Sequence, residues 1–200
     1  MKKLNSRKLN FFRKIELVIS HPHKFFDKVK KEKGMKNVFE FYFIFVFLSV
    51  VINTLFLLPG IMKDSVGVSI TKYFLFLIVL IVFILALTLV TVGLSFVLYW
   101  FYHILIKIFK GKKKYPETYK LLYGATPLLL VLLIPIYGLF KIIIIPLLVI
   151  AALDALYIEY VGLQKLHKMN RHNAIAVLVV AVIIAVLSIF ILNNLGWWPL

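Results

Sequence analysis

Ionisable side chains inside long apolar stretches are the first candidates for chemistry in this sequence. Asp154 falls about 12 residues into the run 142–161, near the middle of a segment long enough to cross lipid. An ionised carboxylate in hydrocarbon costs about 2.5 to 3.5 kcal/mol or more, so Asp154 is a candidate functional residue. The alternative is a protonated or hydrogen-bonded Asp154 that packs helices together.

Three further polar residues lie in such stretches. Glu159 follows Asp154 in the same run and can reach the membrane interface or a lysine there. His103 ends the run 73–106 at a similar depth, so it either pairs with Glu159 or bonds the backbone as a neutral interfacial histidine. Asn53 is expected to hydrogen-bond between helices.

These residues do not form an enzyme signature. The histidines and carboxylates are too scattered to predict a metal site. Neither a metalloprotease, a serine hydrolase nor a phosphate-binding loop motif occurs. We therefore expect no enzyme activity, no cofactor and no metal.

The distribution of apolar residues predicts the elements that position these side chains. Hydrophobic residues make up 62% of the 200, against about half in soluble domains, and charged residues cluster between uncharged runs. This pattern predicts an all-α fold, a polytopic membrane bundle of five transmembrane helices over residues 38–195. The expected spans are 38–58, 73–106, 121–140, 142–161 and 174–192.

The run 73–106 is longer than one crossing needs, so it is either one long helix or a hairpin. A hairpin has only Gly93 for its turn, and we therefore expect one helix. Its polar residues recur on one helical face and should point into the bundle. They are Thr88, Thr91, Ser95, Tyr99 and Tyr102.

Basic residues predict the orientation. The segments 2–36, 107–120 and 165–171 hold nearly all of the 24 Lys and Arg residues, and cytoplasmic segments are the basic ones. A single helix over 73–106 keeps these three segments on one side. We expect a multi-pass protein of the cell (plasma) membrane, with the N-terminus in the cytoplasm and the C-terminus outside.

Residues 1–37 form a separate basic segment with two amphipathic pieces. One covers 9–19, and the other starts at Ser20-His21-Pro22 and ends near Gly34. Both are predicted to lie on the membrane surface, with Phe25, Phe26 and Val29 in lipid; the alternative is a disordered basic tail. The net charge of +16 is then explained by attraction to anionic headgroups. Nucleic-acid binding is not expected, because no recognition motif is present. The lysines expected to contact those headgroups are Lys24, Lys28, Lys30, Lys31, Lys112, Lys113 and Lys114.

Several short stretches carry a resemblance to a known family. They include Tyr115-Pro116-Glu117-Thr118, Tyr123-Gly124-Ala125-Thr126-Pro127 and Val161-Gly162-Leu163 followed by His167. Together they resemble the YIP-domain (Ypt-interacting protein) family of five-span membrane proteins, in its prokaryotic form. One departure is the single Gly111 where many members have two glycines. The positions that match the family's motifs are His103, Gly111, Glu117, Thr118, Tyr123, Gly124, Pro127, Pro135, Gly138, Gly162, His167 and Ala174.

The resemblance implies a non-catalytic membrane protein. Eukaryotic members bind Rab-type GTPases and act in vesicle traffic and membrane shaping. For this chain we expect membrane organisation or recruitment of a protein partner at the cytoplasmic face. The alternative is a small transporter or lipid-moving protein that uses Asp154 beside helices broken at Pro127, Pro135 and Pro146. The sequence leaves the oligomeric state open.

Overall fold

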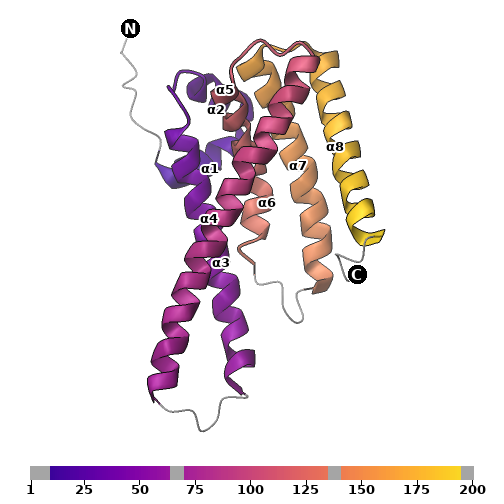
Figure 1. Ribbon diagram of the computed structural model, residues 1–200. Helices are drawn as coiled ribbons and strands as arrows, with labels where there is room; N and C mark the ends of the chain where they lie inside the picture. The colour runs from indigo at the N-terminus through magenta and orange to yellow at the C-terminus, as the bar shows by residue number, and fades with distance from the viewer. Residues whose placement is uncertain (1–9, 64–69, 135–140, 195–200) are drawn as a thin grey trace.

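All described elements of the chain are helical. The computed structural model describes residues 10–63, 70–134 and 141–194. Four helices are long and five segments are short (Figure 1). The long ones are α3 (Lys36–Lys63), α4 (Ile70–Ile108), α7 (Lys141–His167) and α8 (Arg171–Asn194). The short ones are α1 (Phe11–Ser20), α2 (Pro22–Val29), α5 (Tyr115–Tyr119), the 3-10 helix η1 (Lys120–Ala125) and α6 (Thr126–Val131).

Four of the described helices are long and apolar enough to cross a membrane. The crossing segments are Lys36–Leu58, Phe74–Ile108, Ile143–His167 and Arg171–Ile191. The prediction of one long helix over 73–106 is confirmed, and the hairpin at Gly93 is wrong, because α4 continues through that glycine. At 1.5 Å per residue its 39 residues extend about 58 Å, well beyond a core of about 30 Å.

The third predicted span, 121–140, is corrected by the structure. Helical backbone already begins at Tyr115, and it passes from α5 through η1 into α6. Pro127 does not kink a continuous helix but lies at the start of α6, where its missing N–H has no helical partner to lose. Five neighbouring residues of η1, Lys120 to Gly124, are buried, so this segment lines the bundle interior. Pro135, Gly138 and the expected turn before Lys141 lie outside the described residues.

The end of this broken helix is held by α3. The carbonyl of Leu132 accepts hydrogen bonds from Ser49 Oγ at 2.8 Å and from Asn53 Nδ2 at 3.0 Å. Carbonyls at a helix end have no partner within the helix, and lipid offers none. Ser49 and Asn53 therefore supply the donors that let α6 end beside α3.

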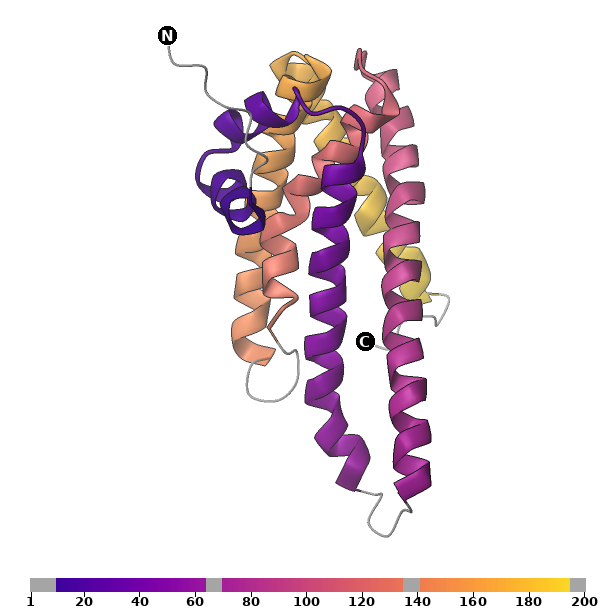
Figure 2. The same cartoon turned by 90° about the vertical axis from the view of Figure 1, so that its left-hand side faces the viewer.

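The N-terminal helices pack on protein. Phe25, Phe26 and Val29 of α2 have no exposed surface, and α2 lies against α7 (Figure 2). The expectation that this apolar face enters lipid is wrong, because protein already covers it. Helix α2 also ends at Val29, before Gly34, whose φ of 71° lies in the left-handed region. That the outer, basic faces of α1 and α2 lie on a membrane surface stays a prediction.

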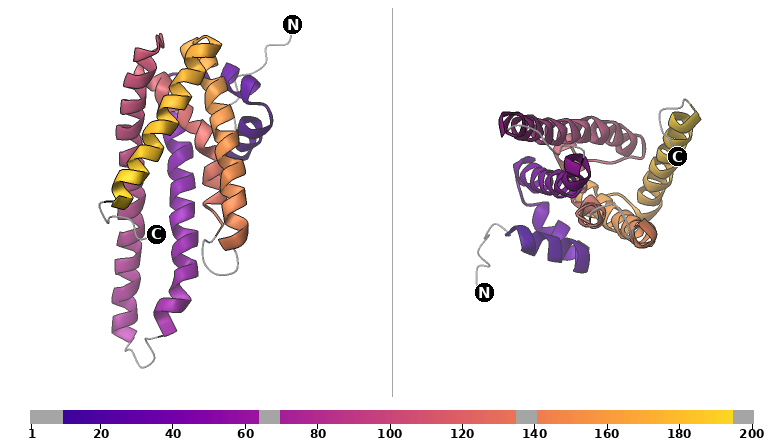
Figure 3. Two further views of the ribbon diagram at one scale, coloured as in Figure 1. Left: turned by 90° about the vertical axis from the view of Figure 1, so that its right-hand side faces the viewer. Right: turned by 90° about the horizontal axis from the view of Figure 1, so that it is seen from below.

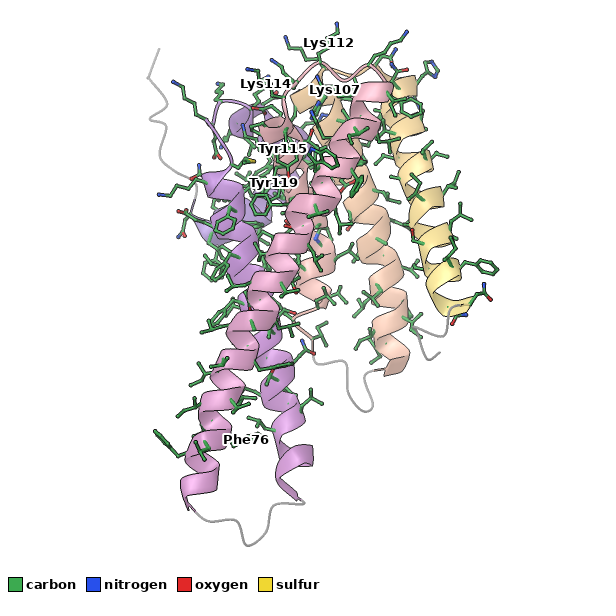
Figure 4. All side chains as sticks on the ribbon, in the orientation of Figure 1. Phe76, Lys107, Lys112, Lys114, Tyr115 and Tyr119 are labelled. Carbon is green, nitrogen blue, oxygen red and sulfur yellow. The ribbon has the colours of Figure 1, made fainter. Side chains whose placement is uncertain are left out.

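Most of the buried core lies toward one end of the bundle. Seen from below, α1 and α2 flank α3 and α6, while α8 stands apart at the opposite side (Figure 3). Phe76 near the start of α4 lies at the far end from the lysines of the 109–114 loop (Figure 4). Side chains on the outer faces of α4 and α8, such as Leu98 and Ile189, are largely exposed and apolar, which fits lipid contact.

Candidate functional site at the basic end of the bundle

The described residues that could do chemistry gather where four segments meet. These segments are the end of α4, the loop that follows it, the α5–η1 piece and the end of α7. Lys107, Lys112 and Lys114 cap this end, and Tyr115 and Tyr119 lie just below them (Figure 4). The backbone N–H of Lys112 donates to the carbonyl of His167, so the loop and the end of α7 are bonded directly.

Thr118 joins two histidines from different helices. Its Oγ1 lies 2.6 Å from His103 Nδ1 and 3.1 Å from His167 Nε2, and the threonine and His167 are fully buried. A hydroxyl has one hydrogen, so it donates to one imidazole and accepts from the other. Three residues that the sequence analysis matched to the family's motifs thus form one hydrogen-bonded chain across α4, α5 and α7.

The proton positions in this chain follow from His167. Its Nδ1 is buried and has no hydrogen-bond partner among the described residues. An unpaired acceptor nitrogen is easier to bury than an unpaired N–H, because only the latter leaves a donor unsatisfied. We therefore assign the His167 proton to Nε2, which donates to Thr118, while the Thr118 hydroxyl donates to His103 Nδ1.

Replacing Thr118 with valine should destabilise the protein by about 2 to 3 kcal/mol. The shape is kept, but two imidazole nitrogens in a buried site lose their partner, at about 1 to 3 kcal/mol for each unsatisfied group. Thr118→Ser keeps the hydroxyl and loses only a methyl group, worth about 0.8 kcal/mol. Thermal unfolding in detergent micelles measures both. A valine variant as stable as the serine variant would show that the hydrogen-bonded chain contributes little.

The carboxylate of Glu159 is held by two tyrosines of α4. Tyr99 and Tyr102 donate their hydroxyls to it at 3.1 and 3.4 Å. Among the described residues, His103 takes neither of its two expected partners, Glu159 or the backbone. Its Nδ1 bonds Thr118, and the tyrosines hold Glu159. Gly124 of η1 provides the space that the Glu159 side chain occupies, since a Cβ on Gly124 would lie 2.5 Å from Glu159 Cγ. The polar stripe predicted on 73–106 therefore supplies the partners of this acid.

Lys120 is a buried charge that the sequence analysis missed. Only 1% of its side chain is exposed, and its Nζ donates to Glu117 Oε1 at 2.9 Å and to the carbonyl of Glu32 at 2.7 Å. The bond to Glu32 ties the segment after α2 to η1. The available signal was Glu117 three residues before a lysine at the start of an apolar run, a spacing that pairs charges on a helix.

Lys14 makes a second inward contact from the N-terminal helices. Its Nζ donates to Tyr123 Oη at 3.2 Å and lies 5.5 Å from the centre of the Tyr123 ring. Phe25 packs edge-on against the same ring, with centroids 4.9 Å apart. Tyr123, a family-motif position, is thus the point on which both α1 and α2 rest.

Gly111 closes helix α4. The N–H of Gly111 donates to Ile106 O at 2.8 Å and the N–H of Lys110 donates to Lys107 O at 3.0 Å, the two bonds of a Schellman motif. Lys110 holds the left-handed position with φ 67°, where glycine is usual. A Cβ on Gly111 would lie 2.9 Å from the backbone oxygen of Ile106, so only glycine fits there.

The remaining lysines form an exposed basic face on this end. Lysines of residues 30–33 and 112–114 border a hollow of about 590 Å³, together with Glu32 and Glu117. The seven lysines predicted to contact headgroups, at 24, 28, 30, 31 and 112–114, are all exposed. We call these seven side chains the basic face.

Asp27 pairs with Lys30 of the basic face and with Lys165, and the second pair fixes α2 against α7. Asp27 accepts from Lys30 at 2.9 Å and from Lys165 at 3.0 Å. These hydrogen bonds, first from Lys30 and then from Lys165, lower the pKa of Asp27 below its ordinary value of 3.8. The carboxylate therefore stays ionised at neutral pH.

Gly162 of α7 provides space for the Phe26 ring of α2, because a Cβ on Gly162 would lie 3.0 Å from that ring.

Asp154 lies apart from this site. It is exposed in the middle of α7, and among the described residues no side chain pairs with it. Ala174, by contrast, is fully buried near the start of α8.

The chain matches the model of one known protein family. The Yip1 domain model matches residues 17–192, nearly the whole chain. The chain belongs to the Yip1-domain family. The family assignment from the sequence is thereby confirmed, and the Yip1 domain is generally a non-enzymatic, multi-pass membrane domain. No curated protein and no solved structure matches the chain.

Most residues that the sequence analysis matched to the Yip1 family lie close together in the fold. Of the motif positions named above, those within the described segments lie mostly in α5, η1, or the parts of α4 and α7 beside them. Within the described residues no group of three or more histidine or acidic side chains could hold a metal ion. The hydrogen-bonded partners are mostly buried and matched to one another, which suits a rigid frame more than a reacting centre.

Proposed function

We propose that this Yip1-domain protein is a non-catalytic organiser of membranes that acts through its basic face. In this proposal the chain passes the plasma membrane five times, with α5, η1 and α6 as the short third pass. The N-terminus and the basic face are cytoplasmic, and the C-terminus is outside. An acidic protein partner would dock on the same face, because opposite charge steers association.

The observation that carries the proposal is the way the lysines are presented. Four of them come from α2 and the segment directly after it, and three come from the loop after α4, more than 80 positions further along the chain. Buried contacts of Lys120, Tyr123 and Gly162 hold α2 and the segment after it on the bundle, and the bond from the Lys112 N–H to the His167 carbonyl holds the loop. A rigid array of exposed cations attracts anionic headgroups at about 1 kcal/mol for each charge near the surface.

Vesicle capture tests this proposal with the full chain. The protein is placed in nanodiscs of neutral lipid, and binding of anionic or neutral vesicles is measured at low and high salt. We expect anionic vesicles to bind at least tenfold more than neutral ones, and to be released by salt because exposed charges are screened. Changing all seven lysines of the basic face to glutamine should remove this binding.

The matched control changes the same seven lysines to arginine, which keeps the charge and should keep capture. Equal capture of anionic and neutral vesicles by the native protein would contradict the proposal. So would full capture by the glutamine variant. The transport alternative based on Asp154 stays a prediction, and no described contact favours it.

A further inference from the structure

Helices α7 and α8 enclose a groove that the basic face does not include. They meet at the basic end and diverge from there (Figure 3). The groove between them has a volume of about 530 Å³, within the range of small-ligand sites. Its α7 wall includes Leu156, Tyr157 and Tyr160, its α8 wall includes Ile175, Val179 and Ile183, and Arg171 stands at its mouth. We call it the α7–α8 groove.

The groove is apolar along its length and cationic at one end. Besides Arg171 its polar lining groups are the tyrosines, and Tyr160 already accepts a hydrogen bond from Gln164 Nε2 at 2.9 Å. Arg171 is exposed, and among the described acidic side chains none pairs with it. A guanidinium presents paired N–H groups that match a phosphate, so the free cation fits an anionic head at this end.

The length of the groove matches one leaflet. From Arg171 to Ile183 the helix rises about 18 Å at 1.5 Å per residue. Half of a hydrocarbon core of about 30 Å is about 15 Å. The groove therefore runs from the headgroup level at the basic end to about the bilayer midplane.

Arg171 separates the two kinds of apolar occupant. An acyl chain and the apolar face of a neighbouring transmembrane helix would both suit walls of Leu, Ile and Val. An anionic lipid also brings a phosphate to the guanidinium at the end of the groove. The charge at that end thus favours an anionic lipid over a neighbouring apolar helix.

We propose that the α7–α8 groove binds one anionic phospholipid of the cytoplasmic leaflet, with an acyl chain between the helices and the phosphate at Arg171. The side of the leaflet rests on the proposed topology. The site itself is separate from the basic face, because none of the seven lysines lines the groove. It holds lipid in a fixed ratio of one per chain, whereas the basic face attracts headgroups without a fixed ratio.

Native mass spectrometry of the delipidated full-length protein tests this site. Phosphatidylglycerol is added in detergent, and phosphatidylcholine of the same chains serves as the comparison. We expect one phosphatidylglycerol to bind at least tenfold more tightly than phosphatidylcholine. Arg171→Gln should remove this preference, and Val179→Trp should weaken both lipids, because the indole fills the groove.

Two matched variants complete the design. Lys168→Gln removes an exposed charge near Arg171 that does not line the groove, and Val186→Trp adds the same indole on α8 below it. Both should bind like the native protein, and thermal unfolding confirms that all four variants fold. Unchanged binding in Arg171→Gln and Val179→Trp would overturn the proposal. Loss of a dimer in Val179→Trp without any loss of lipid would overturn it too.

The glutamine variant of the basic face separates this proposal from the proposed function. It keeps Arg171 and the groove, so it should bind phosphatidylglycerol one to one even when vesicle capture is lost. If it fails to bind that lipid while Arg171→Gln still binds it, the lysines and not the groove form the lipid site, and the groove proposal falls.

Discussion

Replacing Phe26 with alanine should destabilise the protein by about 3 to 5 kcal/mol, the range for a buried phenylalanine that leaves a cavity. Phe26 has no exposed surface, and its ring packs beside Gly162 of α7 and against Phe25. Gly162 has no side chain that could move into the space. The loss should fall on the contact between α2 and α7, so α2 should leave the bundle before the long helices unfold.

Two measurements check this result. Thermal unfolding in detergent should show the lower stability, and trypsin should cut the variant faster at Lys30, Lys31 and Lys33. Phe12→Ala is the matched control, because the same ring is removed from a side chain that is 76% exposed. Equal behaviour of the Phe26 and Phe12 variants would mean that the N-terminal helices are not held by this contact.

Lys120→Met should destabilise the protein by about 2 to 3 kcal/mol. Methionine keeps the length of the side chain but leaves the Glu117 carboxylate and the Glu32 carbonyl without their donor. Breaking a fully buried ion pair costs about 3 to 5 kcal/mol, and the 24% exposure of Glu117 reduces that loss.

The chain contains a closely matched control for this pair. Lys30 and Asp27 have the same i,i+3 spacing and the same 2.9 Å distance, but their side chains are 45% and 43% exposed. Lys30→Met should therefore cost at most about 1 kcal/mol, since solvent screens exposed pairs. Chemical denaturation of the two variants in the same detergent gives the difference. Similar losses would show that burial of Lys120 does not decide its contribution.

Together these contacts explain how a short basic segment becomes part of a membrane domain. Lys14 and Phe25 rest on Tyr123, Phe26 fills the space beside Gly162, and Lys120 bonds the backbone of Glu32. Two of these receiving residues, Tyr123 and Gly162, are among the positions that the sequence analysis matched to the family's motifs. In this chain they hold α1 and α2 against the bundle and so position the basic face.

Parts of the candidate site were readable from the sequence and parts were not. The polar stripe on 73–106 predicted side chains that face the bundle, and Tyr99 and Tyr102 do bind Glu159 there. Neither alternative for His103, Glu159 or the backbone, is the partner that the structure shows. Thr118 lies at a plausible depth as Glu159 does, and only the side-chain directions separate the two. Lys120 was missed, because a count of charges does not distinguish a buried lysine from an exposed one.

The sequence by itself determined the long helices, the continuity of α4 through Gly93 and the membrane class. Uncharged runs of lipid-crossing length can satisfy their backbone only as helices, and that requirement is local. Only the tertiary structure decided that the apolar face of α2 covers α7, that 115–134 breaks into short helices inside the bundle, and that Asp154 faces outward. Those outcomes depend on partners as far apart in sequence as Lys14 and Tyr123, 109 positions, or Asp27 and Lys165, 138 positions. The sequence pattern of a helix indicates which of its faces is apolar, but tertiary packing determines whether lipid or protein covers that face.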